Sequence, residues 1–260
     1  MREKTVTTRL GEISIAIDDT GADPPVVFMH GVFLDKTLWA DYDSNLTGRT
    51  HIYIDMPAHG GSSDVGRDWS LDDCVEMLMS ILDELAIQQC IVIGHSWGSM
   101  TALRAAIKFP SRFAALGLFN MPFKRSTGLN RLGFRLQKLV VIFPKFYAKQ
   151  AAKSLYSKVI LRDRPELSIG MQKRLSKRPS KEISRVIDAV ILNATDTTQL
   201  LNEVQVPALA IVGESDYVGK PPKIETETMI VPGGHISPHE SVAETTQAIK
   251  RVIGLAASSA

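Results

Sequence analysis

The chain opens with alternating apolar and polar positions and continues with short, wholly apolar runs. Residues 5–9 and 13–17 alternate around Leu10-Gly11, which predicts a β-hairpin. Apolar runs predict further strands at residues 25–29, 51–55, 91–93, 114–119, 208–212 and 228–231. Helical spacing of apolar residues occurs at 71–85, 100–109 and 242–253. Apolar strands that alternate with helices indicate an α/β fold, with a mostly parallel sheet covered by helices on both faces.

The alternation of apolar strands and helices stops between residues 122 and 205. There the sequence pattern is helical and basic, and no wholly apolar strand is predicted. Residues 124–200 hold 17 Lys and Arg against 5 Asp and Glu, a local charge of +12, whereas the rest of the chain carries −10 of the total of +2. Such a contrast marks a boundary. We therefore expect a core of residues 1–121 and 206–260, and an inserted helical cap of residues 122–205 that covers a substrate.

Composition excludes several classes of protein. The two cysteines, Cys74 and Cys90, are too few for a disulfide framework or a four-ligand zinc site, and we expect both to be reduced core residues. The sequence has no metal-ligand spacing and no phosphate-binding glycine loop, so neither metal nor cofactor is expected. The basic segment lacks the arrangement of a nucleic-acid-binding module. Residues 1–5 lack an apolar targeting segment, and the expected location is the cytoplasm.

The strongest chemical signal is Gly94-His95-Ser96-Trp97-Gly98, which lies between an apolar strand and a helix. A G-x-S-x-G sequence in that context predicts a sharp turn that projects the serine hydroxyl above the sheet edge. The helix that starts there directs its free N–H groups and its positive dipole end toward developing negative charge. Ser96 is therefore the candidate nucleophile.

A serine hydroxyl needs a base, and the base needs a carboxylate that fixes its tautomer. Among six histidines, His235 follows the last strand, and two glycines before it let the loop return over the sheet edge. His239 is the main rival, with helix capping as its other role. Asp216 lies just past the strand at 208–212 and is the expected acid, with Glu214 as the alternative.

The chain resembles the α/β-hydrolase fold family over almost all of its length outside the cap. The order Ser96, Asp216, His235 is the nucleophile–acid–base order of that fold. His30-Gly31-Val32 is similar to the family's oxyanion loop, so the resemblance implies that the backbone N–H groups of Val32 and Trp97 form the oxyanion hole. Residues 55–62 resemble the family's structural D-x-P-x-H-G-x-S turn. We expect His30 to support the shape of its loop, and the substrate to contact the side chains of His30, Phe33, Phe134 and Phe143.

One departure from the family concerns the link between the acid and the base. Only 18 residues separate Asp216 from His235, and Gly219-Lys220-Pro221-Pro222 within them disfavours a regular helix. The helix usual at this point in the family is therefore expected to be missing or reduced to an extended loop.

These features predict a serine hydrolase that cleaves a carboxylic ester of a small, apolar molecule through an acyl-enzyme. A serine nucleophile argues against the dehalogenase and epoxide hydrolase branches of the family, which use Asp. Two alternatives stay open: a carbon–carbon bond hydrolase with the same triad, and a hydrolase-like receptor that binds a small ligand with little turnover.

The cap contains an amphipathic stretch interrupted near Pro144. Its apolar members are Phe134, Leu136, Leu139, Val140, Ile142, Phe143, Phe146 and Tyr147, and its basic members are Arg131, Arg135, Lys138, Lys145 and Lys149. We expect the apolar face to roof the active site, with the basic residues solvated behind it. The alternative is that the basic face meets anionic lipid, in which case binding would depend on lipid charge and on salt.

Overall fold

A computed structural model describes residues 1–19, 21–46, 48–219 and 226–257. Its centre is a mostly parallel sheet in the order β1-β2-β4-β3-β5-β6-β7-β8, in which β2 runs antiparallel to both β1 and β4. The strands are β1 (Arg2–Thr8), β2 (Gly11–Asp18), β3 (Ala22–Met29), β4 (Arg49–Ile54), β5 (Cys90–His95), β6 (Phe113–Phe119), β7 (Ala208–Gly213) and β8 (Glu227–Val231). The expected hairpin and each of the six apolar strands are confirmed.

Both faces of the sheet are buried, as wholly apolar strands require. Helices α1 (Leu71–Glu84) and α2 (Trp97–Lys108) cover one face, while α9 (Val242–Ala257) and a 3₁₀ helix (Lys36–Asn45) cover the other. Alternate residues of β3 serve the two layers: Val27 and Met29 pack beneath α1 and α2, and Val26 and Phe28 pack on the opposite side. The two cysteines lie buried and unbonded in the first layer.

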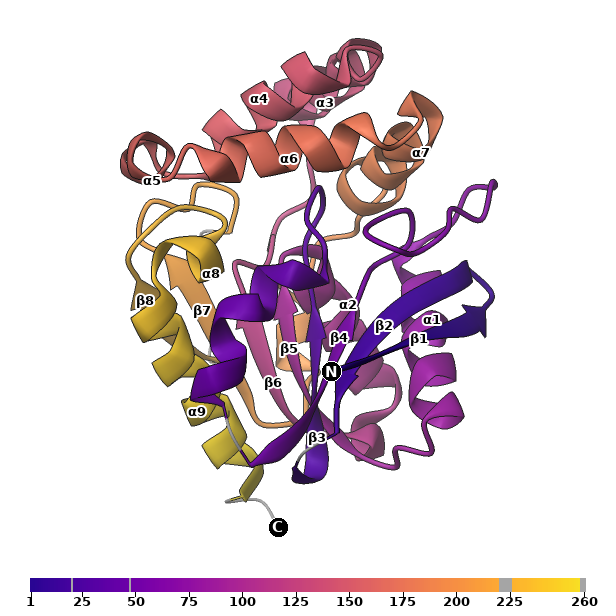
Figure 1. The fold of residues 1–260 in the computed structure, drawn as a ribbon, viewed down its shortest axis with the longest axis vertical. Coiled ribbons are helices and arrows are strands. Elements are labelled where there is room, and N and C mark those ends of the chain that lie inside the picture. The colour runs from indigo at the N-terminus through magenta and orange to yellow at the C-terminus, as the bar shows by residue number, and fades with distance from the viewer. Residues whose placement is uncertain (20, 47, 220–225, 258–260) are drawn as a thin grey trace.

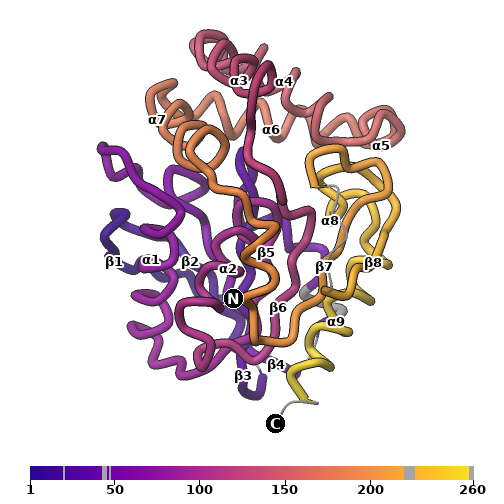
Figure 2. The backbone as a smooth tube through the Cα atoms, turned by 180° about the vertical axis from the view of Figure 1, so that it is seen from behind, coloured from indigo at the N-terminus to yellow at the C-terminus, as the bar shows by residue number. Residues whose placement is uncertain are grey.

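A helical insertion separates β6 from β7. It contains α3 (Gly128–Val140), α4 (Pro144–Leu155), α5 (Lys158–Asp163), α6 (Glu166–Ser176), α7 (Ser180–Val186) and a π-helix (Ile187–Leu192). Figures 1 and 2 show this insertion above one end of the sheet, with α6 nearer to the sheet and α3 and α4 farther away. The parallel strands direct their carboxyl ends at it, which is where open α/β sheets bind ligands.

Salt bridges and hydrogen bonds fasten the insertion to core loops. Arg185 forms a paired contact with Asp64, and the Arg178 guanidinium donates to the Gly60 carbonyl at 2.6 Å. In the part of the chain that the structure describes, no helix is both long and apolar enough to cross a bilayer.

Candidate active site

Ser96 sits on a strained turn between β5 and α2. Its backbone has φ +51° and ψ −106°, a region that non-glycine residues rarely adopt. The flanking glycines make this turn possible, because a Cβ on Gly98 would lie 2.4 Å from the Met29 carbonyl oxygen, and one on Gly94 would lie 2.5 Å from the Gly98 carbonyl carbon. The Ser96 N–H donates to the Phe119 carbonyl at 2.8 Å. The G-x-S-x-G spacing thus holds the serine at the carboxyl edge of the sheet.

Ser96, His235 and Asp216 form a continuous hydrogen-bonded chain of side chains. The distance from the Ser96 Oγ to the His235 Nε2 is 2.9 Å, and the His235 Nδ1 lies 3.0 Å from each carboxylate oxygen of Asp216. All three residues are buried. The three residues singled out from the sequence therefore meet in space, although 139 positions separate the serine from the histidine.

The Asp216 carboxylate is held by several donors. Its Oδ1 accepts from the N–H groups of Val218 at 2.8 Å and Gly219 at 3.0 Å, and its Oδ2 accepts from the Asn120 amide at 2.9 Å. Burial raises the pKa of this carboxyl, but the hydrogen bond and charge of His235, with the donors Asn120 and Gly219, outweigh burial and bring the pKa to about 2. At neutral pH the acid is ionised and oriented.

Asn120 is a site residue that the sequence reasoning missed. It directly follows β6, is fully buried and has φ +49°. Its Oδ1 accepts from the Ser237 hydroxyl at 2.6 Å, which leaves its amide N–H groups to donate to Asp216 and to the Gly234 carbonyl at 3.2 Å. Its position just past a strand, one strand before the acid, is the signal that could have identified it.

The backbone of His235 is fixed on both sides. Its N–H donates to the Leu155 carbonyl at 2.9 Å, and its carbonyl accepts from the His95 Nε2 at 2.7 Å. Burial and the nearby His235 lower the pKa of His95 to about 3, so His95 acts as a neutral donor. The insertion, through Leu155, thus helps to place the candidate base.

The candidate oxyanion loop lies against the candidate nucleophile, because a Cβ on Gly31 would be 3.0 Å from the Ser96 Cβ. The Phe33 N–H donates to His59 Nε2 at 3.0 Å, while within the described residues neither Val32 nor Trp97 has an acceptor for its backbone N–H. Burial lowers the pKa of His59 to about 3, which keeps its Nε2 free to accept. The turn at residues 55–62 therefore supports this loop through His59.

His30 was expected to support the shape of its loop and to contact substrate, and the structure shows the first of these two roles. His30 is fully buried, its Nδ1 donates to the Gly31 carbonyl at 2.7 Å, and its Nε2 accepts from the Met56 N–H at 2.9 Å. Both ring nitrogens are occupied in holding the oxyanion loop to the turn after β4. Phe143, which was also expected to contact substrate, is mostly exposed at the start of α4.

The rival residues lie in other surroundings. Glu214 is exposed. The imidazole of His239 stacks on Tyr156 with ring centroids 5.9 Å apart, and its Nδ1 is hydrogen-bonded with the Tyr156 hydroxyl at 2.7 Å. Burial first, and then Arg174 and Arg164, lower the pKa of His239 to about 3. The link after Asp216 has no helix over residues 217–219, and residues 220–225 lie outside the described part of the chain.

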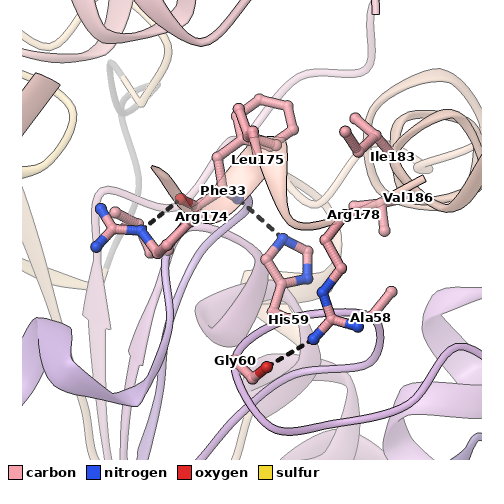
Figure 3. A pocket seen from close by; sticks show the side chains of 10 residues that line it. Phe33, Ala58, His59, Gly60, Arg174, Leu175, Arg178, Ile183 and Val186 are labelled. Carbon is pink, nitrogen blue, oxygen red and sulfur yellow. Dashed lines mark hydrogen bonds between the residues drawn. The ribbon is translucent and has the colours of Figure 1, made fainter. Parts of the chain in front are cut away.

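A small pocket lies between the oxyanion loop and the insertion (Figure 3). Phe33 and His59 line it from the core. The insertion contributes Leu175 of α6, Ile183 of α7 and Arg178, which lies between these two helices. The Phe33 ring meets Tyr147 of α4 edge to face at 5.5 Å. None of the three hydrogen-bonded residues lines this pocket, so it is an adjoining space and not the reaction centre itself. Phe134 is half-buried within the insertion.

The described residues contain no group of three or more His, Cys, Asp or Glu that could hold a metal ion. The site contains a hydroxyl, an imidazole and a carboxylate that are joined by hydrogen bonds in that order. That arrangement can activate an oxygen nucleophile.

Comparison with known proteins places this geometry in a family. A family model described as the α/β hydrolase fold matches residues 24–240. A pimeloyl-[acyl-carrier protein] methyl ester esterase from Methylococcus capsulatus is 28% identical over 218 residues, which cover 78% of this chain and 81% of that protein. An acetyltransferase component of an acetoin cleaving system from Pseudomonas putida is 28% identical over 235 residues, and the match spans 86% of this chain but only 61% of that protein.

Solved structures agree at the level of the fold. A thermophilic esterase from Thermogutta terrifontis superposes with a TM-score of 0.84 and 24% identity, covering 98% of this chain and 99% of that one. An enol-lactonase from Burkholderia xenovorans superposes with a TM-score of 0.85 and 16% identity, covering 96% and 100%. With the matched family model, the eight-stranded sheet and the elbow between β5 and α2, the chain belongs to the α/β hydrolase fold family.

Proposed function

We propose that this hydrolase cleaves carboxylic esters of small, apolar molecules by acyl transfer to Ser96. One observation carries the proposal: the Ser96 Oγ lies 2.9 Å from the Nε2 of a histidine whose Nδ1 lies 3.0 Å from both oxygens of a buried carboxylate. Because the Nδ1 proton is held by Asp216, the Nε2 lone pair is free to take the serine proton. The reaction as proposed needs no cofactor.

In the first half-reaction the Ser96 Oγ bonds to the ester carbonyl carbon while its proton passes to His235 Nε2. The carbonyl π electrons move to the oxygen, and the N–H groups of Val32 and Trp97 stabilise that oxyanion; one such donor is typically worth ~10²–10³ in rate. The tetrahedral intermediate then collapses, the bond to the alkoxy group breaks, and His235 donates its proton to the leaving alcohol. An acyl-enzyme on Ser96 remains.

In the second half-reaction water replaces the alcohol. His235 Nε2 takes a proton from water, the hydroxide oxygen bonds to the acyl carbon, and the acid leaves as the proton returns to the Ser96 Oγ. Asp216 stays ionised throughout and stabilises the imidazolium that forms twice in each cycle. Its pKa of about 2 fits that role, since it remains negative at any pH at which the imidazole can act as a base.

We also propose that residues 122–205 act as a lid over this site. The support is that the insertion contacts both functional loops: Leu155 accepts from the His235 N–H, and the Arg174 guanidinium donates to the Phe33 carbonyl at 3.2 Å. An acyl group on Ser96 would lie beneath these contacts, with Phe33 and Phe134 as its proposed apolar neighbours.

The test is turnover of p-nitrophenyl esters of graded chain length beside a vinylogous diketone, each with wild type and Ser96→Ala. The proposal expects hydrolysis of short or medium esters by wild type, and background rates for Ser96→Ala with an unchanged thermal midpoint. Faster cleavage of the diketone would favour the carbon–carbon bond hydrolase. Ligand binding without turnover of either substrate would favour the receptor.

A further inference from the structure

The outer surface of the insertion is apolar where a water-soluble helix is normally polar. Seven large apolar side chains in and just after α3 are each between 51% and 85% exposed. These residues, the α3–α4 surface below, are Leu129, Leu132, Leu136, Leu139, Ile142, Phe143 and Phe146. Successive members of one series are three or four residues apart, so they share one side of a helical path. The series is Leu129, Leu132, Leu136, Leu139 and Phe143. The apolar face that was expected to roof the active site is thus divided: Phe134, Val140 and Tyr147 pack inward, and its other members, Leu136, Leu139, Ile142, Phe143 and Phe146, are exposed.

The side of α3 opposite the exposed leucines makes the contacts that orient the helix. The Arg131 guanidinium donates to the Leu192 carbonyl, and Lys138 forms a salt bridge with Asp188, both partners belonging to the π-helix. Phe134, on the same side, packs into the apolar layer below. The polar contacts of α3 thus point into the protein and its leucines point away from it. In the described part of the chain nothing covers those leucines.

The chain segment that carries the α3–α4 surface has charge of one sign. Residues 124–158 contain nine Lys and Arg and no Asp or Glu. Seven of the nine are exposed: Lys124, Arg125, Arg135, Lys145, Lys149, Lys153 and Lys158. Contiguous exposed apolar area of this extent marks an interaction site on a soluble protein, and the surrounding cations specify an anionic partner.

We propose that the α3–α4 surface docks onto the face of an anionic lipid bilayer. Leucine and phenylalanine side chains flanked by lysine and arginine are the combination that enters the boundary between headgroups and acyl chains, while the cations meet lipid phosphates. A second copy of this chain is the weaker occupant, because a symmetric contact would bring the exposed cations of one copy against the same cations of the other. Docking here would hold the insertion, and the site beneath it, against the membrane.

The test is flotation of the purified chain with vesicles of phosphatidylcholine, with and without phosphatidylserine, at low and high salt. We expect recovery with the anionic vesicles only, and a decrease at high salt. Lys145→Gln with Lys149→Gln should lower the partition coefficient roughly 25-fold, about fivefold for each cation lost. Leu132→Gln, Leu136→Gln and Leu139→Gln together should lower it roughly 100-fold, since half-exposed leucines lose their burial in lipid.

Matched controls lie elsewhere on the surface. Ile230→Gln on β8 changes an apolar side chain that is equally exposed, and Arg2→Gln with Lys250→Gln removes two exposed cations from β1 and α9. Each control should bind like wild type, and every variant should keep its thermal midpoint. Equal recovery on both vesicle types, or binding that survives the leucine substitutions, would overturn the proposal. So would a wild-type dimer in light scattering that becomes monomeric when the leucines are replaced.

Discussion

Replacing Asp216 with asparagine changes one atom, and the surroundings of the carboxylate determine the consequence. The Oδ1 receives the N–H groups of Val218 and Gly219, and the Oδ2 receives the Asn120 amide. His235 Nδ1 lies equally close to both oxygens. A side-chain amide at this position has one accepting oxygen and one donating NH₂. It therefore cannot accept from the two backbone N–H groups, the Asn120 amide and His235 Nδ1 at the same time.

The two orientations of the new amide differ in cost. With its oxygen toward Val218 and Gly219, its NH₂ faces a single donor, Asn120; the reverse orientation faces two backbone donors. Each buried group left without a partner costs about 1–3 kcal/mol, so the first orientation should dominate. In that orientation the NH₂ lies as close to His235 Nδ1 as the amide oxygen does. An NH₂ repels an Nδ1 proton and donates to an unprotonated Nδ1, so it favours the imidazole proton on Nε2, where the ring cannot accept the Ser96 proton. We expect kcat to fall ~10⁴-fold and the free energy of unfolding to fall by about 1–3 kcal/mol.

The assay is steady-state hydrolysis of the best p-nitrophenyl ester, together with chemical denaturation. Glu214→Gln is the matched control, because it makes the same change to an exposed carboxylate two residues away and should alter neither quantity. An Asp216→Asn variant within tenfold of wild-type kcat would refute the tautomer argument. A large loss in Glu214→Gln instead would assign the acid role to Glu214.

Two further predictions concern the same carboxylate. Asn120→Ala should lower kcat about tenfold with little change in KM, since it removes one hydrogen bond to a charged group and leaves the substrate contacts intact; a change confined to KM would contradict this positioning role. The Asp216 pKa of about 2 lies below its ordinary 3.8, so ionised Asp216 contributes stability that is fully present above about pH 4 and is lost as pH falls toward 2. Denaturation curves across that range should show wild type losing about 2 kcal/mol more than Asp216→Asn, and equal losses would count against the depressed pKa.

The sheet could be predicted because a strand that is buried on both faces has apolar residues at successive positions. Residues such as Ile91, Val92 and Ile93 are apolar in succession, and each fills one of the two layers. The helix after Ser96 begins at Trp97, three residues earlier than its apolar spacing suggested, because its first turn is set by the elbow. The 3₁₀ helix at Lys36–Asn45 was not predicted, since its short turns lack a clear apolar period.

Residues that act through others were harder to find. Asn120, His59 and Leu155 hold Asp216, the oxyanion loop and His235, respectively. Two of these contacts use a backbone group, and all three join segments far apart in the chain. The type of a residue does not encode such contacts. The partner of His30 could not be named for the same reason: its ring accepts from a backbone N–H after β4, which only the folded chain brings near.

The orientation of α3 could not be derived from its sequence pattern. Amphipathic spacing shows that one side is apolar, and the ordinary inference buries that side. Here the Arg131 and Lys138 contacts to the π-helix turn the apolar side outward. The direction was decided by polar partners that lie 61 and 50 residues later in the chain.

The central claim, that Ser96 is the nucleophile of a serine hydrolase, is tested most directly by covalent labelling. Wild type, Ser96→Ala and Asp216→Asn are each treated with a fluorophosphonate ester, and the intact proteins and their peptides are weighed by mass spectrometry. We expect one phosphonyl group on Ser96 of wild type, slow labelling of Asp216→Asn, and none of Ser96→Ala. Stoichiometric labelling of Ser96→Ala, or an adduct on any other residue of wild type, would contradict the account.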